Sequence, residues 1–335
     1  MNLLTEQRDE QAWLDWRRAG VTATDVAEAT DGTYGGAYQV VASKLGLLPR
    51  VETNAAMERG HRWQPTVADA VHTLTGWFVV GEETWCEGND TRWRCTVDGL
   101  LASTPEATSD ELAGVLEIKT VGAGTRHSLE RWQHQVQWQL LVTGLQHAVL
   151  AVATIDDGDD TCTALRLHRM EADPLHQQML TGVAEFLWEH MERQELPDPD
   201  GKALETVKQV WTFADPDAAP VVLDEIGDEL ARFDHIKQQI KALQTEADAI
   251  EALVRARVAD ATNGTAPGWL VKVSEPAQQL SADAETILLQ KYPHLRMAKL
   301  DRTAAKKELG DEYAAHCEPT GARRFTIKAM KGTNQ

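Results

Sequence analysis

The amino-acid sequence predicts a mixed α/β fold in which helices flank a central sheet. Apolar residues recur at helical spacing in some segments, whereas they alternate with polar residues or form short runs in others. These segments follow one another in the order helix, strands, helix, strands, helix, which is typical of layered α/β domains. The expected helices cover residues 8–20, 37–46, 55–75, 128–144 and 174–195, with a further helix starting at residue 24, and the expected strands cover residues 77–80, 92–98, 114–120, 147–155 and 162–169.

Glycines mark the ends of most expected helices. Gly20, Gly46, Gly76 and Gly144 each follow a helical segment, where a residue that tolerates a left-handed backbone is favoured. Residues 156–160, Asp-Asp-Gly-Asp-Asp, predict a hairpin turn between two strands. In the helix of residues 174–195 we expect the apolar side chains to face inward, namely Leu175, Met179, Val183, Phe186 and Leu187.

Composition and pattern divide the chain into three expected domains. Residues 1–197 form the α/β domain, which Pro197 and Pro199 close. Residues 198–262 form a linker and a long heptad-patterned helix, and residues 263–335 form a small α/β module with strands at residues 269–273 and 324–328. Turns are expected in this module at residues 263–264 and 267–268.

The long helix is predicted from a heptad repeat over residues 225–258. One heptad position holds Phe233, Ile240, Ala247 and Val254, and a second holds Ile236, Leu243 and Ile250. Apolar residues at these two positions are typical of coiled coils. About four heptads are also compatible with a helical arm that packs against the first domain, so both interpretations stay open.

The composition excludes several classes of protein. Hydrophobic residues make up 42% of the chain and charged residues 25%, which favours a globular fold over disorder. No apolar run approaches the ~20 residues of a membrane helix, and the first residues lack the pattern of a signal peptide. The four cysteines are scattered without a CxxC pair, which argues against a disulfide framework or zinc finger and fits a reducing cytosol.

The formal net charge of −19 argues against a broad nucleic-acid-binding surface. A local basic channel is still compatible with it, because association depends on the field at the site rather than on the sum. Seven basic side chains could line such a channel, although any single one of them is more often simply exposed on a surface. They are Lys44, Arg59, Arg62, Arg92, Arg94, Arg126 and Arg131.

Three charged side chains on two expected strands are compatible with a metal site, and also with an ordinary strand that carries an exposed Glu–Lys pair. Asp98 ends one strand, and Glu117 and Lys119 lie on the next. Side chains two apart on a strand point to the same face, so pairing of the strands brings the three together. Two neighbouring carboxylates are costly to bury, and Mg²⁺, which prefers carboxylate, carbonyl and water oxygens, removes that cost. The carbonyl of Ile118 is a further oxygen there. Such an ion activates water and neutralises charge on a phosphate.

Several motifs in order resemble the PD-(D/E)XK nuclease superfamily. Asp98 and Glu117-Ile-Lys119 are followed by a helix that contains Gln135-Val-Gln-Trp-Gln139. The segment Arg17-Arg-Ala-Gly-Val-Thr-Ala-Thr-Asp25, the triplet Lys44-Leu-Gly46, and Gly60 followed by Pro65 narrow the resemblance to YqaJ viral recombinases and lambda-type exonucleases. The resemblance covers residues 13–195.

This resemblance implies a PD-(D/E)XK nuclease core and a metal-dependent exonuclease that degrades duplex DNA from a 5′ end and leaves a 3′ single strand. It implies two Mg²⁺ ions, with Mn²⁺ as an alternative, held by Asp98, Glu117, the backbone of Ile118 and the first-helix position of Gln64. Lys119 is then the catalytic lysine, and Gln135 lies at the active site.

The resemblance also implies a site for the 5′ phosphate, made by Arg17 or Arg18 with Thr24. This role is physically reasonable, because a helix start binds anions and arginine binds phosphate with two parallel hydrogen bonds. The family implies a RecT-type single-strand annealing protein as partner, a ring-like trimer, and a phage or prophage origin in the cytoplasm of a bacterial host.

Two departures from the family pattern leave alternatives open. Gln64 stands where the family has a glutamate, which predicts a weaker or water-mediated metal contact, and Trp132 replaces an aromatic hydroxyl. One alternative is a PD-(D/E)XK endonuclease of restriction or repair type. The other is a catalytically weak module that binds DNA ends or the annealing protein.

Overall fold

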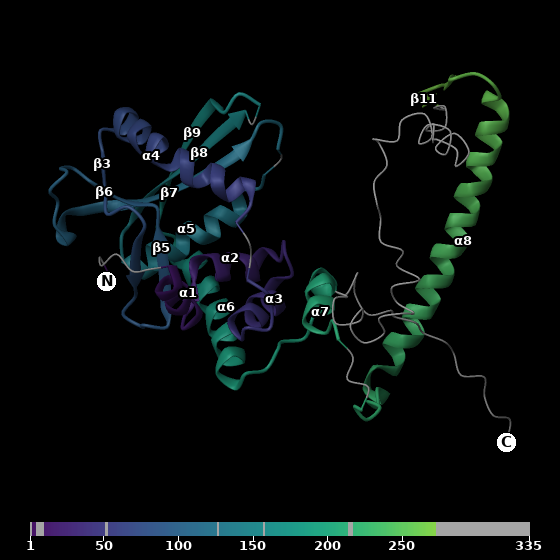
Figure 1. The fold of residues 1–335 in the computed structure, drawn as a ribbon, viewed down its shortest axis with the longest axis horizontal. Helices are drawn as coiled ribbons and strands as arrows, with labels where there is room; N and C mark the ends of the chain where they lie inside the picture. Colours follow the sequence, from purple (N-terminus) through teal and green to yellow (C-terminus); the bar gives the residue numbers. More distant parts are fainter. Residues whose placement is uncertain are drawn as a thin grey trace, which may run out of the picture. The chain divides into compact units, whose positions relative to one another are not determined.

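The computed structural model describes residues 2–4, 10–50, 53–125, 127–156, 158–213 and 217–272 of the chain. The chain divides into two units, residues 1–212 and residues 213–335. The first unit contains two sheets and most of the helices, and the second contains one long helix and a hairpin (Figure 1).

A five-stranded mixed sheet forms the centre of the first unit. Its strand order is β3-β6-β7-β8-β9, and all neighbours are antiparallel except β7 and β8, which are parallel. The parallel pair is joined by helix α5, as a parallel connection requires a crossover. The strands are β3 (Phe78–Val80), β6 (Gly99–Ala102), β7 (Leu112–Gly122), β8 (His147–Asp156) and β9 (Thr161–Glu171), and α5 covers Leu129–Thr143.

Helices cover both faces of this sheet (Figure 1). Helix α4 (Ala55–Thr75) packs Val67 and Val71 against Leu116 and Ile118 of β7. Helix α5 packs on the opposite face, where Val115 belongs to a second core cluster. The alternation of side chains along β7 therefore directs Glu117 and Lys119 toward α5 rather than α4.

The first unit also contains a second, four-stranded sheet, formed by strands from the N-terminal part of the chain. Its strand order is β1-β4-β5-β2, and the chain passes from β5 directly into β6 of the central sheet. Asp98 is the single residue between these two strands. The strands are β1 (Asn2–Leu4), β2 (Val21–Thr22), β4 (Thr84–Glu87) and β5 (Trp93–Val97), and the adjoining helices are α1 (Glu10–Arg18), α2 (Ala23–Asp31), α3 (Gly36–Lys44) and α6 (Pro174–Arg193).

The architecture confirms the predicted fold class, a mixed sheet flanked by helices with a long C-terminal helix. Gly76 and Gly144 end α4 and α5 with φ angles of 77° and 73°, as expected for helix stops. Strands β4 and β6 were absent from the sequence-based expectation, because segments of four residues carry too little periodicity to identify.

Helix α6 buries the predicted face only in part, because Leu187 is buried and Val183 packs against the core as expected, whereas other predicted residues do not. Leu180, Ala184 and Leu187 are its buried residues, spaced so that they form one stripe. Of the side chains expected to face inward, Leu175 is 78% exposed and Met179 and Phe186 are also exposed. The prediction was wrong for these three because two apolar stripes share the helix, and only the tertiary contacts decide which one packs.

The first unit extends beyond its expected end at residue 197. Residues after that point form the short helices η2 (Gly201–Ala203) and α7 (Leu204–Val210). These helices pack on α3, and Trp211 donates a hydrogen bond from its indole nitrogen to the hydroxyl of Tyr38 at 3.2 Å. Segment 198–212, expected to be a linker, is therefore part of the first unit.

The second unit contains α8 (Gly227–Val258), preceded by the short helix η3 (Asp224–Ile226). Strands β10 (Asn263–Ala266) and β11 (Trp269–Lys272) form an antiparallel hairpin that turns at Gly268, with φ of 79°. The predicted turn at residues 263–264 lies within β10 instead, and the predicted strand at residues 324–328 lies outside the described residues. None of the helices in the described ranges is long and apolar enough to span a bilayer.

The close approach of β7 and β8 yields a prediction. A Cβ added at Gly114 lies 2.6 Å from the carbonyl oxygen of His147, and this backbone atom cannot rotate away. We expect Gly114→Ala to lower the free energy of unfolding by roughly 1–3 kcal/mol, measured by urea titration with tryptophan fluorescence.

Gly182→Ala, in α6, is the matched control. Nothing lies within 4 Å of the added Cβ, and alanine favours a helix interior, so stability is expected to rise by about 0.5–1 kcal/mol. Equal stability of the Gly114→Ala variant and the unaltered protein would contradict this strand spacing.

Candidate active site

The structure brings Asp98 and Glu117 together at the junction of the two sheets. The backbone N–H of Ile118 donates a hydrogen bond to Oδ2 of Asp98 at 2.6 Å. This bond joins Asp98 to β7 beside Glu117, whose side chain is buried at 2% exposure. The sequence-based expectation that the two carboxylates converge with Lys119 agrees with this geometry.

Lys119 completes the charged group. Its Nζ lies 2.5 Å from Oε1 of Glu117, and the lysine side chain is 24% exposed. Burial acts against the charged form of Lys119, but the carboxylates of Glu117 and Asp98 outweigh it and raise the lysine pKa. Burial and the charge of Glu117 raise the pKa of Asp98 to about 7. The ammonium therefore compensates one of the two buried carboxylates.

Two glutamines of α5 orient Glu117. Gln135 donates from Nε2 to Oε1 of Glu117 at 2.6 Å, and Gln139 donates from Nε2 to Oε2 at 2.6 Å. Gln139 also donates to the carbonyl of Thr96 at 3.1 Å. We refer to Asp98, Glu117, Lys119, Gln135 and Gln139 as the carboxylate centre.

Sequence reasoning identified Gln135 but not Gln139. The signal that could have found Gln139 is its spacing, because residues i and i+4 share one face of a helix. Gln137, between them, serves the packing of α5 instead. It donates to the carbonyl of Glu171 and accepts from the backbone N–H of Asp173.

The donor set of the carboxylate centre fits a hard divalent cation. Two neighbouring buried carboxylates repel each other when both are ionised, which raises the free energy of the ionised state. A divalent cation between them offsets this repulsion. Within the residues that the structure describes, no group of three or more His, Cys, Asp or Glu side chains gathers. Asp98, Glu117 and the carbonyl of Ile118 are the groups that would hold such an ion, and water would supply its remaining ligands, as is common for Mg²⁺.

The other two positions singled out from the family pattern lie apart from this hydrogen-bond network. Gln64 is half-buried on α4, the helix that covers the opposite face of β7, and no hydrogen bond joins it to Asp98 or Glu117 among the described residues. Trp132 is half-buried on α5 and stacks on His127, with 5.0 Å between ring centroids. The role of Gln64 as a metal ligand stays a prediction.

A second polar group lies around the start of α2. The Arg17 guanidinium donates to the hydroxyl of Thr24 at 2.5 Å and to that of Thr22 at 3.3 Å. Burial lowers the pKa of Arg17 despite the nearby carboxylate of Asp25. The structure thus brings Arg17 and Thr24 together, whereas Arg18 is exposed.

A buried lysine holds this group in place. Lys44 Nζ lies 2.5 Å from Oδ2 of Asp25 and donates to the carbonyls of Arg17 and Gly20 at 2.6 and 2.8 Å. Desolvation acts against ionisation of Asp25, but Lys44 and Arg17 outweigh it and lower the Asp25 pKa. We refer to Arg17, Thr22, Thr24, Asp25 and Lys44 as the Arg17 cluster; Thr22, Asp25 and the position of Lys44 in it were not predicted.

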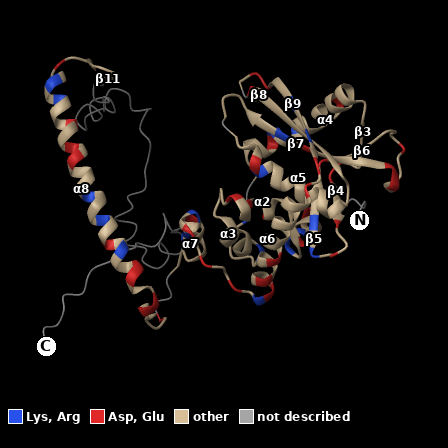
Figure 2. Ribbon diagram, turned by 180° about the vertical axis from the view of Figure 1, so that it is seen from behind, with Lys and Arg blue, Asp and Glu red and all other residues tan. Residues whose placement is uncertain are grey.

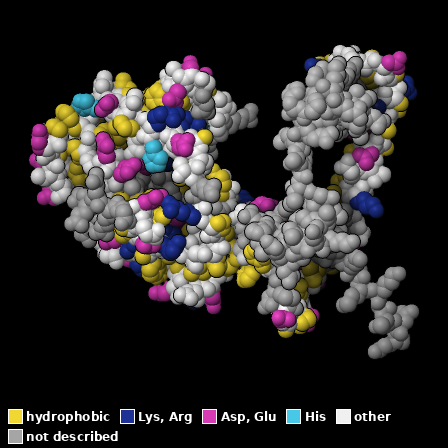
Figure 3. All heavy atoms as spheres, viewed as in Figure 1, with side chains coloured by type: hydrophobic (Ala, Val, Ile, Leu, Met, Phe, Trp, Pro, Cys, Tyr) yellow, Lys and Arg dark blue, Asp and Glu magenta, His cyan; other side chains and the backbone are white. Residues whose placement is uncertain are grey.

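Most basic side chains considered for a DNA channel form ion pairs within the first unit. The pairs are Lys44–Asp25, Arg62–Asp160, Arg92–Asp90, Arg94–Glu87 and Arg131–Glu28. Figure 3 shows Lys and Arg side chains in small groups beside Asp and Glu on one face of this unit. Arg126 lies outside the described residues. These cations therefore meet DNA only in competition with their own carboxylates.

His134 and His176 contact each other rather than a metal-ligand cluster. Their ring nitrogens Nδ1 and Nε2 lie 2.7 Å apart and join α5 to α6. Burial, together with the charge of His176, lowers the pKa of His134.

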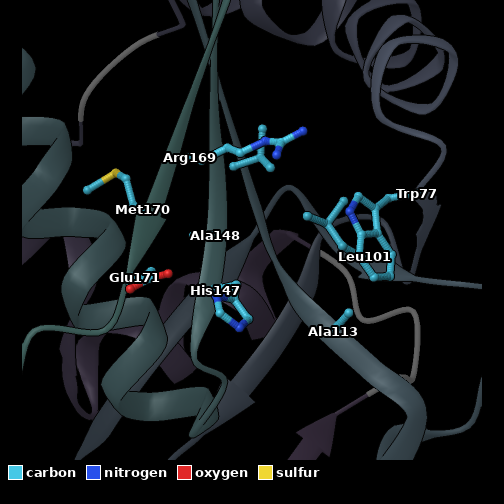
Figure 4. A pocket seen from close by; sticks show the side chains of 9 residues that line it. Trp77, Leu101, Ala113, His147, Ala148, Arg169, Met170 and Glu171 are labelled. Atoms are coloured by element: carbon cyan, nitrogen blue, oxygen red, sulfur yellow. The ribbon is translucent and has the colours of Figure 1, made fainter.

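A pocket of about 420 Å³ lies where β7 and β8 begin. Figure 4 shows Trp77 beside Leu101, with Arg169 extending above the strands. None of the residues of the carboxylate centre or the Arg17 cluster lines it.

Comparison with known proteins finds one family model that matches part of the first unit. Residues 12–146 match the model of the YqaJ-like viral recombinase domain, which confirms the resemblance predicted from the motifs. No curated protein matches the chain. Similar solved structures include an alkaline exonuclease from Laribacter hongkongensis, with 22% identity, a TM-score of 0.42, and coverage of 55% of this chain and 93% of that chain. A phage-related exonuclease from Haemophilus somnus 129PT has 9% identity, a TM-score of 0.35, and coverage of 47% and 80%.

The raised pKa of Asp98 yields a prediction about stability without metal. The folded protein binds a proton at Asp98 up to about pH 7, whereas the unfolded chain releases it near 3.8. The free energy of unfolding therefore falls as the pH rises between these values. In EDTA, we expect Asp98→Asn to unfold at a temperature at least about 3 °C higher than the unaltered protein at pH 8, with a smaller difference at pH 5.

Asp110→Asn, at an exposed aspartate, is the control and is expected to leave the melting temperature unchanged at both pH values. Addition of Mg²⁺ is expected to raise the melting temperature of the unaltered protein but not of Asp98→Asn, because the variant lacks one carboxylate ligand. A difference between Asp98→Asn and the unaltered protein that is the same at pH 5 and pH 8 would contradict this reasoning.

Proposed function

We propose, from the YqaJ-like viral recombinase domain of residues 12–146 and its carboxylate centre, that the protein is a metal-dependent DNA exonuclease. It degrades duplex DNA from 5′ ends and leaves 3′ single strands for homologous recombination. The observation that supports this proposal most directly is the convergence of Asp98, Glu117 and Lys119 at one point of the central sheet.

In this proposal Asp98, Glu117 and the Ile118 carbonyl hold Mg²⁺ or Mn²⁺, in one or two ions, and Gln64 is a further candidate ligand. When bound, the ion supplies Lewis-acid stabilisation of the phosphate charge. Lys119 presents its ammonium beside these carboxylates, so it can orient the attacking water or stabilise the charge that develops on the phosphate oxygens. Gln135 and Gln139 keep the Glu117 carboxylate from rotating away.

The Arg17 cluster is the proposed site for the 5′ phosphate. The Arg17 guanidinium, the Thr24 hydroxyl and the start of α2 combine a cation, a hydroxyl donor and backbone N–H groups, which together suit an anion. Lys44 and Asp25 keep the loop before α2 rigid. Arg18 is the weaker candidate, because its side chain is exposed and does not contact Thr24.

The proposed partners follow from this activity. A RecT-type annealing protein is the proposed recipient of the 3′ single strand, the cytoplasm of a phage-infected or prophage-bearing bacterium is the proposed location, and a trimer is the assembly expected from the family. A second candidate function is a catalytically weak DNA-end-binding module, which the neutral Gln64 favours because one metal ligand is missing its charge.

Nucleotide release from linear duplex DNA tests the nuclease proposal. We expect release to require Mg²⁺ or Mn²⁺ and to fall by roughly a hundredfold or more in Asp98→Asn and Lys119→Ala. Lys208→Ala, at an exposed lysine of α7 that pairs with Glu205, is the control and retains full activity. Supercoiled plasmid is expected to stay intact, whereas nicking would favour an endonuclease.

The role of the Arg17 cluster is tested with duplexes that carry or lack a 5′ phosphate. We expect the unaltered protein to prefer phosphorylated ends and Arg17→Met to lose most of that preference, because methionine keeps volume but not charge. Arg18→Met is the matched control and is expected to keep the preference. Products labelled on each strand report polarity, and loss of the preference in Arg18→Met alone would assign the site to Arg18 instead.

A further inference from the structure

Helix α8 presents an apolar stripe to solvent along most of its length. It has 32 residues, none of them buried. Ile236, Ile240, Leu243 and Ile250 are between 40% and 65% exposed, and Leu253 at the border of this stripe is 59% exposed. A helix in water gains most of its stability from packing of its apolar face, and exposed stripes of this kind mark interaction sites. The stripe therefore requires a partner surface.

The heptad positions of α8 specify what kind of partner fits. Positions a and d carry the apolar stripe, with Ala247 as the small residue among larger ones. The flanking e and g positions include Lys237 and Glu251 at e, and Arg232 and Glu246 at g. Charges at e and g decide the orientation of paired helices. Figure 2 shows basic and acidic residues spaced along α8.

A parallel pair of two α8 helices is disfavoured by these charges. In that orientation each g residue faces the e residue five positions later on the other helix. Arg232 then meets Lys237, and Glu246 meets Glu251, and symmetry repeats both contacts. All four are like-charge contacts. Ala247 also meets Ala247, which leaves a poorly filled layer in the interface.

An antiparallel pair resolves both problems in one register. Position a of one helix then packs against position d of the other. Ile240 packs against Ile250 of the second copy, and the small Ala247 packs against the larger Leu243, so that the layers have similar volumes. Ile236 and Val254 form the next layer, and the two-fold axis passes near residue 245.

The same register pairs opposite charges. In an antiparallel pair e faces e, so Lys237 of each copy meets Glu251 of the other. Glu251 already forms an exposed ion pair with Arg255 one turn later, at 2.6 Å; such pairs are weak, so the carboxylate is available to both cations. Glu246 meets its own copy at the two-fold axis, which is the one like-charge contact in this arrangement.

Neighbouring registers lose these contacts. A shift of one heptad in one direction places Glu229 against Val254, and a shift in the other places Arg257 against Ile240. Both shifts separate Lys237 from Glu251. In the favoured register Arg257 lies opposite Phe233 at the end of the stripe, where a guanidinium can stack on the ring.

We propose that α8 is a self-association helix that pairs antiparallel, through Ile236, Ile240, Leu243, Ala247 and Ile250, with α8 of a second copy of this chain. The occupant is a second copy because α8 is complementary to itself in both volume and charge. This proposal concerns the second unit and does not depend on the proposed nuclease activity. Each such pair links two chains, in addition to the trimer proposed above.

Light scattering of the full chain tests the self-association. We expect Leu243→Glu/Ile250→Glu to halve the number of chains per particle at micromolar concentration, because four charges enter each apolar interface. Ala242→Glu/Ala249→Glu adds the same charges at two positions outside the stripe and is expected to keep the mass of the unaltered protein. An unchanged mass in Leu243→Glu/Ile250→Glu, or a monomeric unaltered protein, would overturn the proposal in favour of another occupant.

Cross-linking tests the orientation. Glu246→Cys lies at the two-fold axis and is expected to form a 246–246 disulfide under oxidation, identified by mass spectrometry. Gln239→Cys, at the preceding g position, faces Leu253 instead and is the matched control without a self-cross-link. Similar cross-linking at both positions, or cross-linking that persists with Leu243→Glu/Ile250→Glu, would contradict the antiparallel register.

Charge reversal provides an independent test. Lys237→Glu and Glu251→Lys are each expected to weaken association, by roughly tenfold in the dissociation constant, and the double variant is expected to restore it. In a parallel pair each single reversal would instead create attraction, with Arg232 or Glu246, and strengthen association. The sign of the single-variant effect therefore decides between the two orientations.

Discussion

The first unit depends on burying two carboxylates at the junction of its two sheets. An ionised carboxyl loses its hydration on burial, so it is stable there only with donors and opposite charge around it. Glu117 obtains them from Lys119, Gln135 and Gln139, and Asp98 obtains one from the backbone of Ile118. This requirement accounts for the position of Gln135 and Gln139 of α5 against Glu117.

The Arg17 cluster applies the same principle with the charges reversed. A buried arginine and a buried lysine share one carboxylate, Asp25, and their remaining donors bind hydroxyls and backbone carbonyls. The Arg17 cluster, with two cations and one carboxylate, therefore has a formal charge opposite in sign to the overall charge of −19. An acidic protein can therefore present selected cations to a phosphate while its other basic side chains pair with carboxylates.

The two units differ in how far their apolar side chains are buried within the unit itself. The first unit covers both faces of its sheet with its own helices, and its two core clusters contain most of the buried side chains. In the second unit α8 has no buried residue, so its apolar stripe lacks a comparable core within the described residues. The proposed catalytic centre and the proposed self-association helix therefore lie in separate parts of the chain.

The sequence alone determined the fold class, most helices and strands, and the convergence of Asp98, Glu117 and Lys119, because these follow from periodicity and the two-residue repeat of a strand. Only the tertiary structure decided that Gln139 joins Gln135 on Glu117, that Arg17 rather than Arg18 meets Thr24, and that α6 buries Leu180 instead of Met179. In each case the alternatives are two side chains of the same type, or two side chains on the same helix. Only the packing of that helix against another element decides which of the two is used. Local pattern contains no information about which of two equivalent faces the rest of the chain covers.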